Sequence, residues 1–207
     1  MKKIGVLVSG GGSNLQAIID SIETWQIKAE IAVVISNKPG VHALDRAKKH
    51  GIPAVVVNHR DYQSNQEFTQ AILNILQENR VDLVCLAGFL RILDPVLTDA
   101  FPNRILNIHP ALLPSFGGPG MYGHHVHEAV IASGTQFSGA TVHFVTPETD
   151  IGPIITQGIV PVDDNDDPDS LAAKVLEIEH SIYPEAVKLV LEERIKIEGL
   201  RVKKIDN

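Results

Sequence analysis

Three side chains in the second half of the chain have the types needed to stabilise a developing negative charge and to move a proton. In Asn107-Ile108-His109-Pro110 an amide and an imidazole are one residue apart, so an extended backbone projects both to the same side. Pro110 favours that extended conformation at His109. An amide can donate a hydrogen bond to a developing oxyanion, and an imidazole can do the same or move a proton. Asn107 and His109 are therefore candidate catalytic residues, although the residue types alone favour the alternative, a histidine satisfied in a strand-to-loop corner.

Asp150 lies in a loop-like segment, Thr146-Pro147-Glu148-Thr149-Asp150-Ile151-Gly152-Pro153. A carboxylate in this loop could orient His109 and raise the pKa of its ring. An ordinary loop aspartate is the alternative, because aspartate is common in turns.

A glycine-rich segment, Ser9-Gly10-Gly11-Gly12-Ser13-Asn14, follows the first apolar run. It lacks the Gly-Lys-Ser/Thr of a P-loop and the third glycine of the dinucleotide fingerprint. Free N–H groups at a helix start, with Ser13 and Asn14 as further donors, predict a site for a single phosphate. A tight turn in which Ser13 or Asn14 only caps the helix is the alternative.

Two other groups of residues could suggest chemistry. His124, His125 and His127 invite a metal site, but no carboxylate or cysteine cluster completes a ligand set, so a solvated helix start is the better interpretation. Cys85 lies in an apolar run, where a buried inert thiol is expected. We expect no metal.

Alternating apolar runs and helical spacings indicate the scaffold. Strand-like runs alternate with helix-like segments through the first half, a rhythm typical of βαβ units in a doubly wound, mostly parallel sheet with flanking helices. The expected strands are 4–8, 31–35, 54–57, 83–86, 104–108, 140–145 and 154–160. The expected helices begin at Asn14 (with Trp25 on its apolar face), Ala43, near Phe68, and at Asp167-Pro168.

We expect one α/β domain spanning residues 1–207, with two lobes around a cleft. The first lobe, about 1–100, would bind a nucleotide, and the second, about 101–207, would be the catalytic and folate-binding lobe. The long segment Pro110 to Gly123 predicts a functional loop.

Composition narrows the class of protein. The chain has 207 residues, 44% hydrophobic and 21% charged, which is ordinary for a globular protein. A net charge of −7 argues against an extended nucleic-acid surface. The apolar run after Met1 ends too early for a signal peptide, and no stretch is long enough for a membrane span. We expect a cytoplasmic protein with small-molecule substrates, monomeric or homodimeric, and no nucleic-acid or membrane partner.

Five blocks in order resemble phosphoribosylglycinamide formyltransferases of purine synthesis, over nearly the whole chain. These blocks are Ser9-Gly-Gly-Gly-Ser-Asn14, Leu86-Ala-Gly-Phe-Leu-Arg-Ile-Leu93, Leu106-Asn-Ile-His-Pro-Ala-Leu-Leu-Pro114, Thr141-Val-His-Phe-Val145 with Asp150-Ile-Gly-Pro153, and Glu179-His-Ser-Ile-Tyr-Pro184. The resemblance implies formyl transfer from 10-formyltetrahydrofolate, as co-substrate, to the amine of glycinamide ribonucleotide. It also implies direct attack, with protonated His109 and Asn107 stabilising the oxyanion and Asp150 keeping His109 charged.

The resemblance also implies residue roles. Asn107, His109 and Asp150 match the catalytic trio, with His143 as a supporting residue. Gly12, Ser13, Asn14 and Glu179 would bind the ribonucleotide. The folate pocket would be lined by Leu90, Arg91, Ile92, Leu93, Asn107, Thr146, Pro147, Glu148, Thr149 and Asp150.

Two positions depart from the family pattern. Asn65 stands near the place of a folate-contacting arginine, with Arg60 nearby, and the segment Phe116 to His125 is longer than in some members. Because of the first departure, the sequence does not show which residue replaces the arginine in contacting the folate. We assign no role to any residue of the longer segment, residues 115–125.

Three other functions share parts of this pattern. Formyltetrahydrofolate deformylase has the same trio but an additional N-terminal domain, for which we expect no room here. Methionyl-tRNA formyltransferase needs a C-terminal domain and a basic surface. A non-catalytic nucleotide-binding module would leave the pairing of His109 with Asp150 without a purpose.

Overall fold

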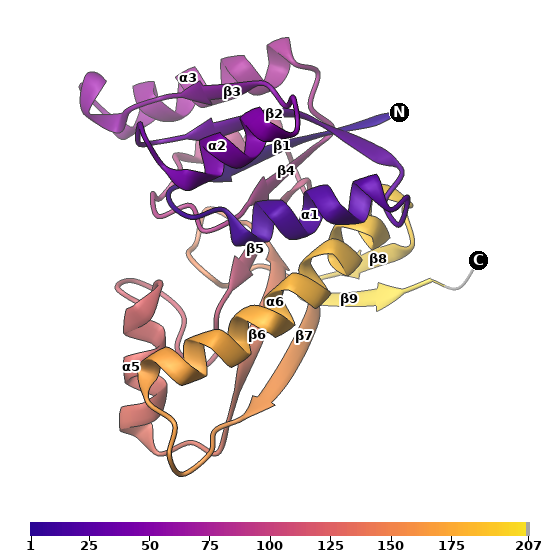
Figure 1. Cartoon of the computed structure of the whole chain (residues 1–207). Helices are drawn as coiled ribbons and strands as arrows, with labels where there is room; N and C mark the ends of the chain where they lie inside the picture. Colours follow the sequence, from indigo (N-terminus) through magenta and orange to yellow (C-terminus); the bar gives the residue numbers. More distant parts are fainter. Residues whose placement is uncertain (206–207) are drawn as a thin grey trace. The chain divides into compact units, whose positions relative to one another are not determined.

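The computed structural model describes residues 1–205, and it is an α/β protein built on a mostly parallel sheet (Figure 1). Its internal contacts form two compact units, Met1–Asn107 and Ile108–Asn207. Whether they form one domain around a cleft stays a prediction. Among the described residues, no helix combines the length and the apolar character needed to cross a membrane.

The first unit is a doubly wound sheet with the strand order β3-β2-β1-β4-β5. All of its strand pairs are parallel. Its elements are β1 (Lys2–Val8), α1 (Ser13–Glu23), β2 (Ala29–Ser36), α2 (His42–Lys49), β3 (Ala54–Val56), the short 3₁₀ helix η1 (His59–Asp61), α3 (Asn65–Glu78), β4 (Leu83–Leu86), α4 (Pro95–Ala100) and the start of β5 (Ile105–His109).

The strand order of this sheet reverses at one point. The chain moves outward from β1 to β3 and then returns to β4, so the direction reverses between β1 and β4. In parallel α/β sheets, ligands bind at the carboxyl ends of the strands beside such a reversal. The glycine-rich segment follows β1 at this edge, and residues 87–94 follow β4.

Continuous apolar runs form the inner strands because both faces of the sheet are covered. Ile4, Val6, Leu7 and Val8 of β1 are fully buried, and so are Val33, Val34 and Ile35 of β2. Helix α1 packs against α2, whereas α3 packs against α4.

The second unit contains the remaining sheet, in the order β6-β7-β9-β8. Its elements are α5 (His124–Ser133), β6 (Phe137–Phe144), β7 (Ile154–Pro161), α6 (Pro168–Leu191), β8 (Ile195–Glu198) and β9 (Arg201–Lys204). Strands β6 and β7 are antiparallel, and α6 packs on both. A Cβ added at Gly158 of β7 would lie 2.2 Å from Ile178 Cγ2, so only glycine allows α6 to pack this closely.

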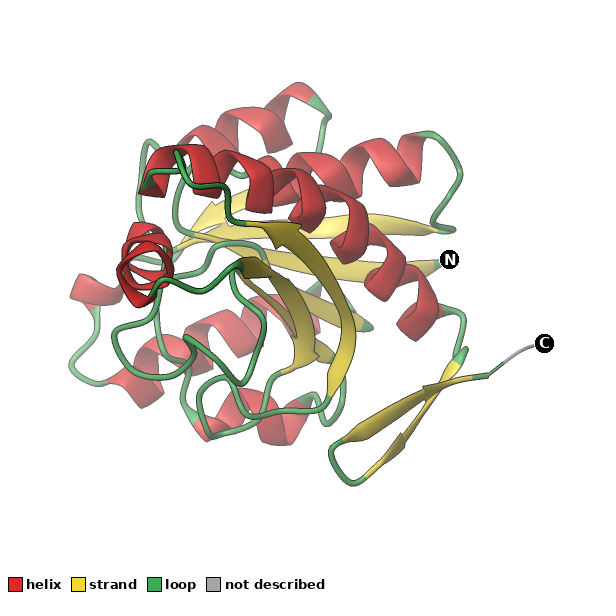
Figure 2. Ribbon diagram, turned by 90° about the horizontal axis from the view of Figure 1, so that it is seen from below, coloured by secondary structure: helices red, strands yellow, loops and turns green. Residues whose placement is uncertain are grey.

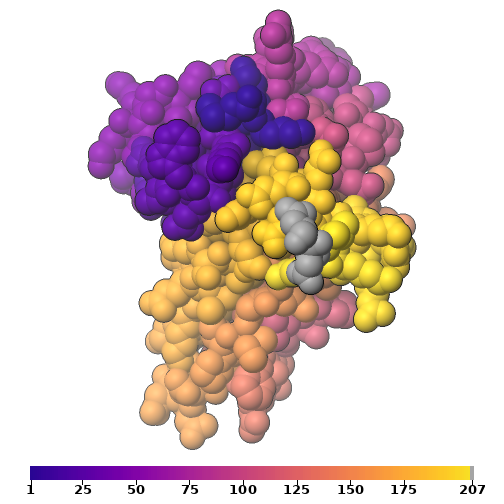
Figure 3. All heavy atoms as spheres, turned by 90° about the vertical axis from the view of Figure 1, so that its right-hand side faces the viewer, coloured from indigo at the N-terminus to yellow at the C-terminus, as the bar shows by residue number. Residues whose placement is uncertain are grey.

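The hairpin of β8 and β9 ends the described chain. Figure 2 shows it beside the mark of the C-terminus, and its yellow atoms lie at the surface in Figure 3. Strand β9 pairs with β7 through Ile154 and Arg201, and the turn residue Leu200 is 68% exposed.

Most expected elements are confirmed, and three differences have physical causes. Helix α1 ends at Glu23, so Trp25 lies outside it with φ 60 and an exposed fraction of 78%, rather than on its apolar face. Helix α4 was not expected because it has only six residues. The hairpin of β8 and β9 was not expected because its short strands are rich in charge, which indicates no buried face.

Candidate active site

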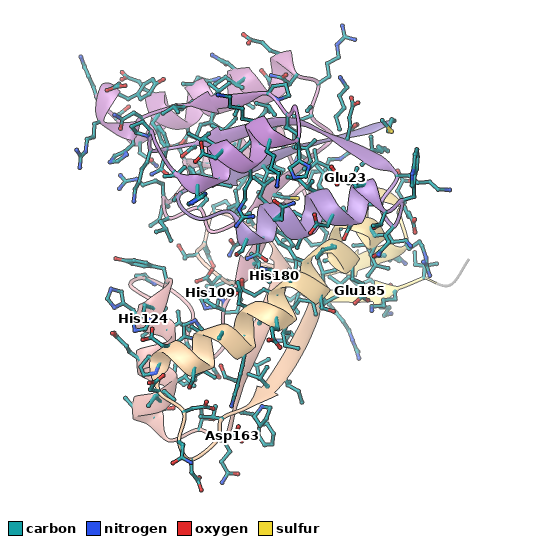
Figure 4. The ribbon with its side chains drawn as sticks, viewed as in Figure 1. Glu23, His109, His124, Asp163, His180 and Glu185 are labelled. Carbon is teal, nitrogen blue, oxygen red and sulfur yellow. The ribbon has the colours of Figure 1, made fainter. Side chains whose placement is uncertain are left out.

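His109 ends β5 and is 4% exposed (Figure 4). Its Nε2 lies 2.8 Å from the carbonyl oxygen of Phe116, so Nε2 is the nitrogen that donates there. Its Nδ1 lies 3.7 Å from Asp150 Oδ2. That distance is too long for a direct hydrogen bond, but it is close enough for a strong charge interaction in a buried site.

Asp150 lies in the turn between β6 and β7 and faces the imidazole, as the sequence predicts. Its φ of 58° is in the left-handed region, which aspartate tolerates better than most residues. Its Oδ2 accepts a hydrogen bond of 2.9 Å from the backbone N–H of Gly118. The turn is tightly closed, because a Cβ at Gly152 would lie 1.8 Å from the carbonyl oxygen of Phe144.

His143 approaches the same carboxylate from β6. Its Nε2 lies 3.6 Å from Asp150 Oδ1, and its Nδ1 bonds the carbonyl oxygen of Phe144 at 2.9 Å. The pairing of β6 with β7 shifts between Val142 and His143. Irregularities of this kind change the direction of nearby side chains, and His143 lies directly beside this one.

Burial and charge compete at His109. Burial lowers the pKa of His109, and this effect outweighs the raising effects of Asp150 and of the Phe116 carbonyl, while His143 adds a smaller lowering effect. The net shift of the His109 pKa is therefore opposite in direction to the one expected from Asp150 alone. The carboxylate does raise the pKa as expected, but removal of the ring from water costs more.

Asp150 shows the opposite balance. Burial alone would raise the pKa of its carboxyl group. The pKa is nevertheless lowered, because His143, the Gly118 N–H and His109 all stabilise the carboxylate. Asp150 is thus held as a carboxylate beside a ring whose pKa is lowered, and this pair can accommodate a proton when negative charge develops nearby.

Asn107 lies on β5 two residues before His109 and pairs with Leu86 of β4. The alternation of the strand gives both side chains the same direction. Asn107 is half-buried.

The glycine-rich segment leads into α1 and has the geometry of an anion site. Gly12 is the N-cap, with φ 72 and no side-chain hydrogen bond to the helix start. The alternative in which Ser13 or Asn14 caps the helix is thus wrong, because both lie inside its first turn. The first turn of α1 carries no acidic residue, so no carboxylate of that turn would repel a phosphate bound there.

The segment after β4 provides exposed apolar surface in the first unit. Leu90 and Ile92 are 49% and 68% exposed, Arg91 is exposed, and Leu93 is half-buried. The backbone N–H of Leu90 donates to Ser9 Oγ at 2.8 Å. This bond joins the predicted folate segment to the glycine-rich segment, at the carboxyl ends of β4 and β1.

The remaining residues considered in the sequence belong to a turn and to three helical elements. Thr146 to Thr149 form the turn before Asp150, where Thr146 Oγ1 donates to the Glu148 carbonyl at 3.0 Å. Glu179 lies on α6 with an exposed fraction of 7%. Asn65 is the first residue of α3, capped by Ser64, and Arg60 lies in η1.

The three clustered histidines differ from one another. His124 begins α5, as the solvated helix start predicts, and both His124 and His125 are exposed. His127 is only 6% exposed, because the same helix turns it inward, so it is not solvated as expected. Burial, then His124 and His109, lower the pKa of His127. Among the described residues, no group of three or more His, Cys, Asp or Glu side chains is arranged to hold a metal ion.

Comparison with known proteins identifies the family. The profile of the formyl transferase family, named "Formyl transferase", matches residues 2–187. The chain belongs to this family. A chloroplastic phosphoribosylglycinamide formyltransferase of Arabidopsis thaliana is 42% identical over 196 residues, which are 94% of this chain and 67% of that protein. The trifunctional purine biosynthetic protein adenosine-3 of Homo sapiens is 45% identical over 91% of this chain, but this chain spans only 18% of that protein.

Solved structures agree with the formyl transferase fold. Glycinamide ribonucleotide transformylase 1 of Symbiobacterium toebii has a TM-score of 0.95 and 45% identity, covering 100% of this chain and 95% of that one. A formyltetrahydrofolate deformylase of Pseudomonas syringae has a TM-score of 0.90 with 25% identity, and this chain covers 66% of it. The deformylase is thus the more distant relative of the two.

Sequence reasoning missed the residues that complete the formyl transferase site through their backbone. The Phe116 carbonyl and the Gly118 N–H contact His109 and Asp150, respectively. Neither contact uses a side chain, so residue type gives no signal for them. The sequence did contain one indication of these contacts: the long segment from Pro110 to Gly123 is rich in glycine, and glycines often occur where the backbone lies close to another group.

Proposed function

We propose that this formyl transferase moves the formyl group of 10-formyltetrahydrofolate to the amine of glycinamide ribonucleotide, in de novo purine synthesis. The observation that carries the proposal is Asp150 facing His109 at 3.7 Å, in a chain 45% identical to a solved glycinamide ribonucleotide transformylase. The substrates are small molecules, and the cytoplasm is the proposed compartment.

The proposed reaction is a direct acyl transfer. The amine nitrogen of the ribonucleotide attacks the formyl carbon, and negative charge develops on the formyl oxygen. The bond between that carbon and the folate nitrogen then breaks, and the proton lost by the amine ends on the folate nitrogen. The enzyme returns to its starting state and forms no covalent intermediate.

We assign stabilisation of the oxyanion to Asn107 and His109. His109 Nε2 carries the donating proton that the Phe116 carbonyl accepts in the free protein. Donation to a formyl oxygen therefore requires this hydrogen bond to be exchanged. The imidazolium form becomes more favourable beside the growing negative charge, so Nδ1 takes up a proton from solvent and returns it when the product leaves. Asp150, which faces Nδ1, balances the added positive charge.

The binding roles rest on exposed backbone and apolar surface. Gly12, Ser13 and Asn14 hold the phosphate of the ribonucleotide, and Glu179 contacts the same substrate. The exposed apolar side chains of Leu90 and Ile92 suit the flat ring system of a folate. The other proposed folate contacts are Arg91, Leu93, Asn107 and the turn from Thr146 to Asp150, while His143 supports Asp150.

A transfer assay with both substrates tests the proposal. Formyl transfer should require glycinamide ribonucleotide, and His109→Ala should lower kcat by about a hundredfold or more, the loss usual for one oxyanion donor. His125→Ala, which removes an exposed imidazole of α5, is the matched control and should retain activity. Release of formate with no dependence on the ribonucleotide would instead identify a deformylase.

A further inference from the structure

The carbonyls of the three glycines in the glycine-rich segment each have a protein partner. The Gly10 carbonyl accepts from the Ala43 N–H at 3.1 Å, and the Gly12 carbonyl accepts from the Gln16 N–H at 2.9 Å. The Gly11 carbonyl accepts from Arg46 Nε at 2.9 Å. In a trans peptide the carbonyl and the following N–H point in opposite directions. The N–H groups of Gly11, Gly12 and Ser13 are therefore turned away from these partners.

The Gly11–Gly12 peptide is the one among these three whose carbonyl is held by a side chain. The carbonyls on either side of it bond backbone groups at the starts of α2 and α1. Glycine gives a peptide unusual rotational freedom, and both residues here are glycine. Without its partner, this peptide could turn its carbonyl, rather than its N–H, toward an anion.

The Arg46 side chain is itself held in place. Its Nη1 donates to Gln16 Oε1 at 3.1 Å, and Gln16 Nε2 donates to Asp20 Oδ1 at 2.8 Å. Gln16 also lies 3.2 Å from His50 Nε2. The other ring nitrogen of His50 lies 2.6 Å from Glu23, which Figure 4 labels at the end of α1. A planar guanidinium fixed at two of its nitrogens has a defined orientation.

Helix α2 brings Arg46 close to the glycine-rich segment. A Cβ added at Gly12 would lie 2.6 Å from Ala43 Cβ and 3.5 Å from Arg46 Cδ. By contrast, Cβ atoms added at Gly10 and Gly11 would meet nothing within 4 Å. Arg46 thus packs behind the segment, while the other side of Gly10 and Gly11 is open.

We propose that Arg46 is a positioning residue for ribonucleotide binding. It holds the Gly11–Gly12 peptide so that the Gly12 N–H faces the phosphate, and it supplies a positive charge behind that peptide. This inference rests on the proposed function, in which the segment holds the phosphate of glycinamide ribonucleotide. Arg46 acts through the backbone and takes no part in the chemical step.

Steady-state kinetics of Arg46→Ala test the inference. The KM for the ribonucleotide should rise about tenfold or more, because that factor corresponds to the free energy that one hydrogen bond from a charged donor contributes. The KM for formyl-folate and kcat should stay within about twofold, because the reacting groups are unchanged. Arg46→Lys keeps the charge but lacks the planar guanidinium that bonds both Gly11 and Gln16, so it should recover only part of the affinity.

The matched control is Lys48→Ala, which removes an exposed positive charge from the same helix. It should leave the KM for the ribonucleotide unchanged. An unaltered KM in Arg46→Ala, or an equal rise in Lys48→Ala, would overturn the inference. If Arg46→Ala does not fold, Gln16→Ala removes the second anchor of the guanidinium and should raise the same KM by a smaller factor; an unaltered KM in that variant would also overturn it.

Inorganic phosphate separates this inference from the proposed function. In NMR titrations with phosphate, the amide signals of Gly11, Gly12 and Ser13 should shift in the parent protein, and Arg46→Ala should need about tenfold more phosphate. A parent protein that binds phosphate this way but transfers no formyl group contradicts the proposed function and leaves the role of Arg46 supported. Equal phosphate affinity in both proteins contradicts the role of Arg46 alone.

Discussion

At the residue scale, the candidate site depends on an imbalance between two neighbouring ionisable groups. Burial keeps His109 neutral more than Asp150 keeps it charged, while three partners keep Asp150 ionised. Stabilisation of a developing charge is most effective when it acts in the transition state and not before it. In the proposed mechanism, a ring whose pKa is lowered beside a carboxylate meets this condition, because the ion pair forms as the oxyanion does.

Asp150→Asn tests this balance directly. The carboxylate raises the pKa of His109, so its removal should lower that pKa further below the ordinary value of 6.5. The kcat for formyl transfer should fall by about a hundredfold, because the imidazolium loses its counter-charge. NMR titration of the His109 ring measures the first effect, and the transfer assay measures the second.

The control for this variant is Asp169→Asn, which removes an exposed carboxylate near His124 in the same unit. This variant should not change the pKa of His109. An unchanged or higher pKa of His109 in Asp150→Asn would show that the carboxylate does not act on the ring.

The sequence predicted the partners at this scale but not their balance. Alternation placed Asn107 and His109 on one side of a strand, and the family motif added Asp150. The burial of His109 could not be predicted from the sequence, because the atoms of Phe116 and Gly118 that contact the site belong to the backbone. The net pKa of His109 depends on that enclosure.

At the element scale, helices and strands with a long apolar repeat could be predicted from the sequence, whereas short or highly charged elements could not. The capped start of α6 at Asp167-Pro168 is as expected, with the Asp167 side chain accepting from the Ser170 N–H at 2.8 Å. Helix α4 and the hairpin of β8 and β9 depend on packing in the folded chain more than on local pattern. The burial of His127 could not be predicted for a similar reason, because the buried face of a helix can be identified only when the element packed against it is known.

The junction of β1, α1 and α2 gives a prediction of its own. Gly12→Ala should lower the free energy of unfolding by about 2 kcal/mol or more, from the left-handed φ and the crowded Cβ together. Its φ is 72, and the added Cβ would lie 2.6 Å from Ala43 Cβ and 2.9 Å from Ala43 Cα. Urea unfolding measures the change.

Gly10→Ala is the matched comparison within the same segment, because its Cβ would meet nothing within 4 Å. Its free energy of unfolding should differ from that of the parent protein by roughly 0.5 kcal/mol or less. Equal losses in the two variants would mean that the contact with α2 does not determine the shape of the segment.

At the scale of the whole molecule, the chain combines a net charge of −7 with a proposed substrate that carries a phosphate. The net charge opposes the approach of such a ligand at long range, so local donors are needed to hold it. Backbone N–H groups at the start of α1 provide them without any change in net charge. The distribution of charge, and not its total, therefore decides what this protein binds.

Acid should destabilise the whole fold in two steps. The pKa values of His109 and His127 are lowered from 6.5 in the folded protein, so the unfolded chain binds protons there that the folded protein does not. This contribution to stability is present above pH 6.5 and is lost as the pH falls below it, by up to about 1.4 kcal/mol per pH unit for each ring. Asp150, whose pKa is lowered from 3.8, adds stability that is lost only as the pH falls below that value.

Urea unfolding between pH 7.5 and 5 checks the first step. His127→Gln removes one of the two buried rings, so its free energy of unfolding should depend less steeply on pH than that of the parent protein. Ser133→Ala, a non-titrating change on the same helix, should displace the curve without altering its slope. An equally steep curve in His127→Gln would mean that the ring takes up its proton in the folded protein as readily as in the unfolded chain, which burial at 6% exposure argues against.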